Sequence, residues 1–383
     1  MNLALPLMTA GHEDVRSRAR AFVAEHLLPH IDKWEAARDF PRDLFATTGK
    51  AGWFGAKFDS RWGGTGPDLL AEVAWIEELS RCGSGGVAAD LGAHSQLASL
   101  YVARQGSDEH CERWLRPSIA GEIVGGLGVT EPGAGSDVNG LRTRAVRDGG
   151  DWVINGAKTF ITNGAWADYV VVAARTNPEA GHAGVTLFVV EAATPGFEQR
   201  RMKMVGWQTS HTGDLSFVDV RVPDDNRLTE EGRGFYAIME NFAWERLMMS
   251  LGANVACAEA LADVVRVVNE HGTGRDWART IADLAVDIAQ ARALTEHALR
   301  LHVNNEAGAP VDGAELLRAT AMSKLVTQRL AVRACNLALD VRGADAIEPG
   351  HPVRRWLRDA RLGPIGGGTD EIMREIVAGT LAL

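Results

Sequence analysis

The chain has 383 residues, 46% of them hydrophobic, so it can bury a large core spread over two or three domains. Its formal net charge is −10, and lysine and arginine are scattered among acidic residues without forming a basic block. This pattern argues against nucleic acid or an anionic membrane as the main partner. No apolar run reaches the length of a membrane span, and residues 1–10 lack the features of a secretory signal.

The cysteines and histidines give little sign of disulfides or metal. Four cysteines stand far apart with no CxxC pair: Cys82, Cys111, Cys257 and Cys335. This favours reduced, mostly buried thiols in a cytoplasmic protein. Only His26 and His30 have the i, i+4 spacing of a helical metal pair, and Pro29 lies between them with no acidic third ligand nearby. We therefore expect no metal site.

The first third of the chain, residues 12–118, has the apolar spacing of helices. The pattern is clearest at 15–28 and 69–81, where apolar residues recur every three or four positions. Glycine-rich breaks fall at 63–66 and 83–86. We expect a helical unit here.

Between about 123 and 225 the pattern becomes that of strands. Residues 152–154, the Asn155-Gly156 pair and residues 158–162 predict a strand, a type I′ turn and a second strand. Three more runs rich in β-branched residues predict further strands: 169–174, 185–190 and 215–222.

From Gly234 onward helical spacing returns over three long segments, 235–270, 277–306 and 313–342. The order along the chain is therefore helices, antiparallel strands, helices. A parallel βαβ sheet would alternate strand and helix throughout, so that fold is not expected.

Glu245 is the most informative residue. It lies on the same helical stripe as four apolar residues: Phe235, Ile238, Phe242 and Met249. A glutamate there loses water, which disfavours its charge and raises its pKa toward neutrality, where a proton-abstracting base works best. The alternative is a glutamate paired with a basic neighbour such as Arg246.

The segment Gly128–Asp137 is a polar, glycine-rich loop between the helices and the strands. Its backbone N–H groups and the hydroxyls of Thr130 and Ser136 can converge on a ligand. An ordinary tight connection explains it equally well. It is not a GxGxxG loop after a strand, so a nicotinamide-binding unit is disfavoured.

Together, four segments resemble the acyl-CoA dehydrogenase family: Val-Thr-Glu-Pro-Gly-Ala-Gly-Ser-Asp at 129–137, Phe-Ile-Thr-Asn-Gly at 160–164, Glu245-Arg246, and Gly-Gly-Gly-Thr-Asp-Glu-Ile-Met-Arg at 366–374. The resemblance covers nearly the whole chain. It implies an α+β, mainly α fold, with an N-terminal helical domain at 1–119, a middle antiparallel β-barrel-like domain at 120–230 and a C-terminal four-helix bundle at 231–383.

The resemblance also implies FAD as cofactor. The loop 127–136 would lie against the flavin ring, with Phe160 and Thr162 flanking it near N5; for Phe160 the alternative is a core residue of a strand. The implied cofactor-binding residues are Leu127, Val129, Thr130, Gly135, Ser136, Phe160, Thr162, Gly343, Thr369 and Glu371. The implied substrate-binding residues are Ser136, Phe242, Arg246 and Gly368.

The family places its catalytic base at either of two positions. Most members carry it on the C-terminal loop, two residues before the threonine that is Thr369 here, and that position is Gly367. A branch that resembles isovaleryl- and long-chain acyl-CoA dehydrogenases carries it on the first long helix of the C-terminal domain, which is Glu245 here. We therefore expect Glu245 to be the base and the Gly367 N–H to hold the thioester oxygen.

Two segments depart from the family pattern. Residues 273–279 are shorter than usual and lack a Phe-Gly pair, and residues 340–346 keep only Gly343 of a glycine-rich motif. Both motifs reach the FAD tail of a neighbouring subunit in the family. Asp340 would place a negative charge near the pyrophosphate unless Arg275 or Arg342 compensates.

The expected activity is α,β-dehydrogenation of an acyl-CoA to a trans-2-enoyl-CoA, with hydride transfer to flavin N5. One alternative is a dehydrogenase or oxidase acting on an acyl or aminoacyl group held by a carrier protein. A second is a non-catalytic paralogue. Electron-transfer flavoprotein or O2 would be the acceptor, and the family resemblance and long apolar helices predict a homotetramer in the cytoplasm.

Overall fold

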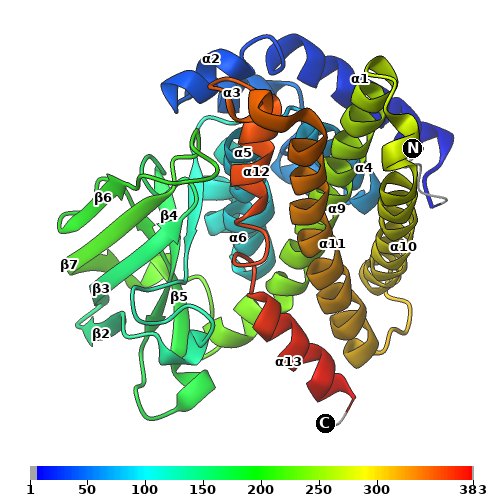
Figure 1. Cartoon of the computed structure of the whole chain (residues 1–383). Helices are drawn as coiled ribbons and strands as arrows, with labels where there is room; N and C mark the ends of the chain where they lie inside the picture. Colours follow the sequence, from blue (N-terminus) through cyan, green and yellow to red (C-terminus); the bar gives the residue numbers. More distant parts are fainter. Residues whose placement is uncertain (1–6, 382–383) are drawn as a thin grey trace.

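The computed structural model describes residues 7–381, which fold into N-terminal helices, a curled sheet and C-terminal helices (Figure 1). The predicted fold class, α+β and mainly α, is confirmed. The N-terminal helices are α1 Ala10–His26, α2 Ile31–Ala37, α3 Asp43–Lys50, α4 Leu69–Ser80, α5 Gly85–Ala93, α6 Ser99–Gln105, α7 Asp108–His110 and α8 Arg116–Ile119. Single π-helical turns at His94–Ala98 and Cys111–Leu115 join α5 to α6 and α7 to α8.

Local chemistry accounts for the limits of these helices. The Asp68 carboxylate accepts hydrogen bonds from the backbone N–H groups of Leu70 and Ala71, which caps α4. The predicted helix 15–28 starts earlier, at Ala10, and ends at His26, three residues before Pro29. The helices enclose a core in which Trp53 and Trp75 stack with ring centroids 4.9 Å apart.

The middle part is a seven-stranded sheet within the described residues. Its strands are β1 Gly125–Gly128, β2 Arg144–Asp148, β3 Asp151–Ile161, β4 Tyr169–Arg175, β5 Val185–Glu191, β6 Phe197–Arg201 and β7 Gly213–Pro223. Most pairs are antiparallel, with Tyr169 of β4 opposite Glu191 of β5, whereas β1 runs parallel to β4. The sequence pattern did not reveal the short strands β1, β2 and β6.

The type I′ turn predicted at Asn155-Gly156 is wrong. Both residues lie inside β3, which runs unbroken and changes register against β7 between Ile154 and Gly156. The Asn155 amide pairs with Asp219 of β7, donating to its carboxylate at 3.1 Å and accepting from its N–H at 2.9 Å. Asn-Gly therefore forms a bulge here, because a neighbouring strand satisfies the asparagine.

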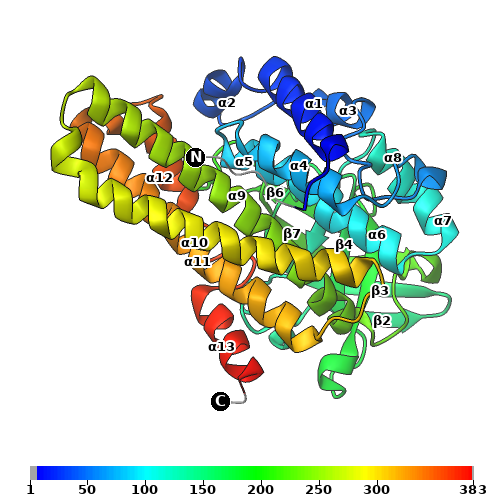
Figure 2. The same cartoon turned by 90° about the vertical axis from the view of Figure 1, so that its right-hand side faces the viewer.

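The C-terminal part is built from three long helices, α9 Gly234–Glu270, α10 Gly274–Glu306 and α11 Gly313–Arg342. They lie side by side, as Figure 2 shows. Their bounds agree with the predicted helices to within three residues. The shorter α12 Pro352–Ala360 and α13 Asp370–Thr380 pack on α11.

One hydrophobic cluster joins all three parts. It contains Tyr101 of α6, Val129 and Ala134 of the glycine-rich loop, and Trp244 and Leu247 of α9. The parts therefore bury a common core, and the surfaces beside it are held in fixed relation.

The four cysteines are buried and unpaired, as predicted. None of the helices in residues 7–381 is long and apolar enough to cross a membrane.

Candidate functional site

Glu245 lies in the first half of α9, and its side chain is half-buried. Burial raises the pKa of its carboxyl group, while the nearby positive charges of Arg246 and Lys324 act in the opposite direction. Among the described residues no ion pair joins Glu245 to Arg246. The Arg246 guanidinium instead donates from Nε to the carbonyl oxygen of Gly367 at 3.2 Å.

The loop before α13 contains two successive glycines in left-handed backbone conformations. The φ angle is 62° at Gly367 and 96° at Gly368, values that side chains other than glycine adopt at a cost. Arg246 binds the Gly367 carbonyl, and the ammonium of Lys324 on α11 donates to the Gly368 carbonyl at 2.5 Å. Two cations on two different helices therefore hold adjacent carbonyl groups of this turn.

Gly367 lies directly beside Glu245. A Cβ atom added to Gly367 would lie 3.8 Å from Glu245 Oε1 and 2.4 Å from Met249 Sδ. No described residue accepts a hydrogen bond from the Gly367 N–H, so this donor remains available to a ligand.

A buried ion pair secures the glycine-rich loop. Lys158 of β3 donates to Glu131 Oε1 at 2.8 Å and to the Val129 carbonyl at 3.0 Å, and its side chain is fully buried. The Glu131 carboxylate also accepts from the N–H groups of Arg142 and Thr143 at 2.6 and 2.9 Å. Burial lowers the pKa of Lys158 to about 8, whereas the ammonium and the N–H donors hold the pKa of Glu131 below its ordinary value despite burial.

Phe160 is exposed at the end of β3. Its side chain is 58% exposed and its φ angle is 58°, which is rare for an aromatic residue. A register shift between Lys158 and Ile161 turns it away from the buried face. The alternative of a strand core residue is therefore wrong, and strained backbone of this kind gathers at functional sites.

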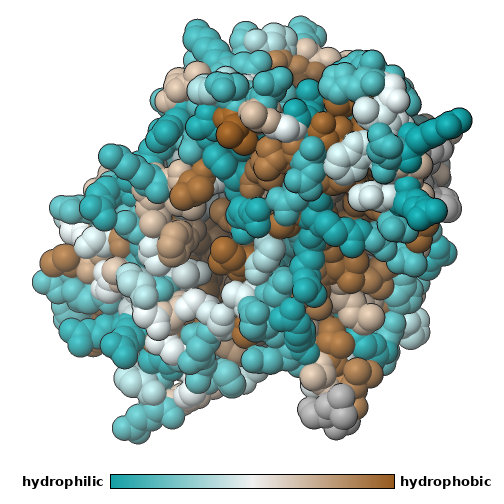
Figure 3. Space-filling view, in the orientation of Figure 1, coloured by the Kyte–Doolittle hydropathy of each residue, from teal (hydrophilic) through white to brown (hydrophobic). Residues whose placement is uncertain are grey.

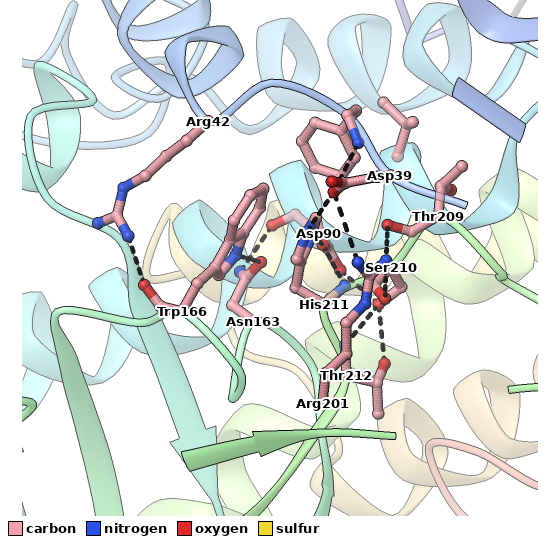
Figure 4. Close-up of polar contacts among 12 residues, drawn as sticks. Asp39, Arg42, Asp90, Asn163, Trp166, Arg201, Thr209, Ser210, His211 and Thr212 are labelled. Atoms are coloured by element: carbon pink, nitrogen blue, oxygen red, sulfur yellow. Dashed lines mark hydrogen bonds and ion pairs between the residues drawn. The ribbon is translucent and has the colours of Figure 1, made fainter. Parts of the chain in front are cut away.

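A polar network anchors the turn that follows Phe160 (Figure 4). Asn163, fully buried with a φ of 63°, donates to the Asp90 carbonyl of α5 at 2.9 Å. His211 accepts at its carbonyl from the Ala165 N–H, and its ring lies between Asp90 and Asp39 at 3.1 and 2.7 Å. The turn is thus fixed to the N-terminal helices and to the β6–β7 loop.

The surface between the sheet and the C-terminal helices is hollowed and lined with hydrophobic residues (Figure 3). Partly buried residues pack against the shared core from both sides of the glycine-rich loop, Leu127 at the end of β1 and Val138 just after the loop, and from α9, namely Phe235, Met239 and Phe242. No described residue forms a hydrogen bond with the hydroxyls of Thr130, Ser136 or Thr162. The structure thus brings the loop and the Glu245 helix onto one core.

Three predicted cofactor residues lie elsewhere or have structural partners. Gly343 caps the C-terminal end of α11 with a φ of 70°. Thr369 caps α13 by accepting from the Ile372 N–H at 3.3 Å. Glu371 is exposed and pairs with Arg374 at 3.3 Å.

The arginines near the two altered segments differ in their partners. Arg342 is committed to Asp263, donating from Nε at 2.7 Å, so it is not free to offset Asp340. Arg275 is exposed at the start of α10, and no ion pair joins it to a described carboxylate. Within residues 7–381, Arg342 therefore has an ion-pair partner and Arg275 has none.

Three family models match the chain in order. Residues 9–122 match the acyl-CoA dehydrogenase N-terminal domain, 126–220 the middle domain and 232–382 the C-terminal domain. The chain belongs to the acyl-CoA dehydrogenase family. Members are FAD-dependent flavoprotein oxidoreductases that act on CH–CH groups.

Individual acyl-CoA dehydrogenases and related proteins resemble the whole chain. It is 34% identical to the mitochondrial long-chain specific acyl-CoA dehydrogenase of Sus scrofa over 97% of this chain and 86% of that one. An acyl-CoA dehydrogenase structure from Geobacillus kaustophilus matches with a TM-score of 0.93 and 32% identity over 99% and 100% of the two chains. The prolyl acyl carrier protein oxidase AnaB matches with a TM-score of 0.91 and 25% identity over 98% and 100%.

The residues of β3 and the glycine-rich loop fit the flavin ring expected of an acyl-CoA dehydrogenase. An exposed aromatic side chain held at positive φ offers a flat apolar face, and the hydroxyls of Thr130 and Thr162 offer hydrogen bonds to ring heteroatoms. A side chain added at Gly133 or Gly135 would meet no atom within 4 Å, so the tip of the loop is open.

Sequence reasoning missed three charged residues of this site: Glu131, Lys158 and Lys324. The signal for Lys324 was present, because it lies three and four residues from Ala321, Thr327 and Gln328 on the buried stripe of α11. Glu245 was found by that same test. The partnership of Glu131 and Lys158 had no comparable signal, since it spans 27 positions and depends on the path of β3.

Proposed function

We propose that the protein catalyses FAD-dependent α,β-dehydrogenation of an acyl thioester, with Glu245 as the base. The supporting observation is the convergence of the two family base positions, since a Gly367 Cβ would lie 3.8 Å from Glu245 Oε1. Gly367 has no side chain to accept a proton. Glu245 has a carboxyl group at that place, with a pKa raised by burial.

In this proposal each residue has a defined task. Glu245 removes the α-proton of the thioester, and the Gly367 N–H donates to the thioester oxygen as negative charge develops there. Phe160, Thr130 and Thr162 hold the flavin ring. FAD, when bound, supplies N5 as acceptor of the β-hydride. The apolar residues around Phe242 exclude water from the reacting carbons.

We propose acyl-CoA as the substrate and a homotetramer in the cytoplasm as the working form, with electron-transfer flavoprotein as acceptor. The similarity to a long-chain acyl-CoA dehydrogenase over 97% of the chain supports the CoA thioester. The four unpaired cysteines fit a reducing compartment.

A second candidate is a dehydrogenase or oxidase of an acyl or aminoacyl group on a carrier protein, with O2 as acceptor. The fold similarity to a prolyl carrier-protein oxidase favours it. Stopped-flow bleaching of the oxidised flavin distinguishes the two. The same acyl groups would be presented on CoA and on a phosphopantetheinylated carrier protein, without and with O2.

Faster bleaching by the CoA thioesters supports the first proposal, and faster bleaching by the carrier thioesters supports the second. A purified protein that is colourless and takes up no added FAD would contradict both and indicate a non-catalytic paralogue.

A further inference from the structure

We propose that Lys324 is a positioning residue for the dehydrogenation: it holds the Gly367–Gly368 turn in place and provides the positive charge that favours the anion formed beside Glu245. The inference rests on the proposed function. It concerns a residue on α11, outside the loop and the helix that carry the reacting groups.

The geometry is that of a clamp on two adjacent carbonyls. Lys324 Nζ donates to Gly368 O at 2.5 Å and Arg246 Nε donates to Gly367 O at 3.2 Å. Because the N–H and C=O of a trans peptide point in opposite directions, fixing these carbonyls fixes the planes of the peptide units that follow Gly367. The Gly367 N–H belongs to the preceding peptide unit, and the left-handed conformation of Gly367, with a φ of 62°, sets its direction relative to the two clamped units.

Lys324 is buried, so the presence of a lysine at this position calls for a physical reason. The residue has 0% of its surface exposed and makes no ion pair with a described carboxylate. A buried, unpaired ammonium costs free energy that a methionine of similar length would avoid. Burial lowers the pKa of Lys324 to about 8 against the pull of Asp370, so the group still carries its charge near neutral pH.

The charged groups facing Lys324 come from two other elements. Glu245 and Arg246 lie on α9, and Asp370 and Glu371 lie in the first turn of α13. Asp370 and Glu371 are near the start of their helix, where its dipole offsets negative charge. The positive charge of Lys324 therefore favours an ionised Glu245 carboxylate, or a substrate enolate next to it, over the state in which Glu245 and the substrate are both neutral.

A substrate analogue that stops after proton removal tests this directly. We would use a 3-thiaacyl-CoA, whose sulfur acidifies the α-proton and blocks loss of a β-hydride. Removal of the α-proton next to oxidised flavin produces a long-wavelength charge-transfer band. Titrating that band with pH in the FAD-loaded protein measures the loss of one proton shared between the ligand and Glu245.

We expect Lys324→Met to move the midpoint of this titration upward by about one pH unit, because a nearby opposite charge typically shifts a carboxyl pKa by one to three units. Lys324→Arg keeps the charge and should stay close to the wild-type midpoint. Thr327→Val, three residues further along the helix, removes a buried hydroxyl bonded to Ser323 O at 2.7 Å and serves as the matched control.

The outcomes separate this inference from the proposed function. If the wild-type protein gives no band, the proposed function fails. If the wild-type band is lost in Glu245→Gln but Lys324→Met keeps the wild-type midpoint and intensity, the role of Lys324 is overturned. Lys324→Gln, which keeps a hydrogen-bond donor without charge, replaces Lys324→Met if the latter does not fold.

Discussion

A side chain at Gly367 and the side chain of Glu245 would meet at the same place, although the two residues belong to elements that are far apart in the chain. The Cβ that Gly367 lacks would lie 3.8 Å from Glu245 Oε1, although the residues belong to the loop before α13 and to the first half of α9. A carboxylate can reach this place from either backbone. What matters for proton removal is the location of the oxygen relative to the proton, not the element that delivers it.

Glu245→Gln should abolish dehydrogenation while the protein still binds FAD. Glutamine keeps the shape but cannot accept a proton, and loss of a general base costs about two to four orders of magnitude. Stopped-flow bleaching of the flavin measures the effect, and the flavin absorbance of the purified variant verifies cofactor binding. Bleaching at the wild-type rate would place the base elsewhere.

Gly367→Glu in the Glu245→Gln background should restore part of the activity, more for short acyl chains because the new side chain takes up space. The new Cβ would lie 2.4 Å from Met249 Sδ, and glutamate must adopt the φ of 62°. Adding Met249→Ala relieves that contact and should increase the recovery. If the double and the triple variant both fold and bind FAD yet show no turnover with any acyl chain length, that result would contradict the interpretation that the base can be placed at either Glu245 or Gly367.

Lys158→Met should destabilise the protein by about 3 kcal/mol, because it leaves the buried Glu131 carboxylate without its countercharge. The double variant Lys158→Met/Glu131→Gln removes both charges and should be more stable than Lys158→Met alone. Thermal unfolding of each single and double variant gives the coupling energy. Additive effects of the two substitutions would show that the pair does not hold the loop together.

Asn163 tests the anchoring of the turn after Phe160. Asn163→Gly keeps the backbone conformation but loses the bond to the Asp90 carbonyl, whereas Asn163→Ala also strains a φ of 63°. We expect weaker FAD binding in both variants and a larger loss of stability in Asn163→Ala. FAD titration and thermal unfolding measure the two effects. Unchanged FAD affinity in Asn163→Gly would mean that the turn needs no such anchor.

The protein should be a tetramer built as a dimer of dimers. The long C-terminal helices leave apolar side chains exposed, including Val286 of α10 and Met322 and Val326 of α11 at 56%, 38% and 40%. Light scattering at micromolar concentration measures the mass. A monomeric mass would contradict the prediction, and Met322→Lys should weaken the assembly if this surface is the contact.

Long periodic segments could be predicted from the sequence, and short or long-range features could not. The three C-terminal helices were found to within three residues because their apolar spacing repeats over many turns. The strands β1, β2 and β6 have at most five residues and little alternation. The Asn155-Gly156 pair shows the limit of a local rule, since Asp219 on another strand decides its conformation.

The same distinction between local patterns and long-range contacts applies to the residues of the candidate site. Glu245 was visible because one charge interrupts an apolar stripe on a single helix. The anchoring of the Phe160 turn depends on Asp39, Asp90 and His211, which come from three segments brought together only by tertiary packing. No pattern within one segment marks them as partners.

The carbonyl clamp on the glycine turn also bears on how the molecule assembles. Arg246 and Gly367 are separated by 121 positions, and Lys324 and Gly368 by 44. A nascent chain that stops short of Gly367 lacks one partner of each contact, even when its sheet and long helices have been synthesised. Contacts so far apart in the chain form slowly, because a long loop must close before they contribute. Under the proposed function, the arrangement of Glu245 beside the glycine turn is therefore completed late in biosynthesis, and an intermediate with a folded sheet and no turn in place would leave the Glu245 carboxyl group more open to water.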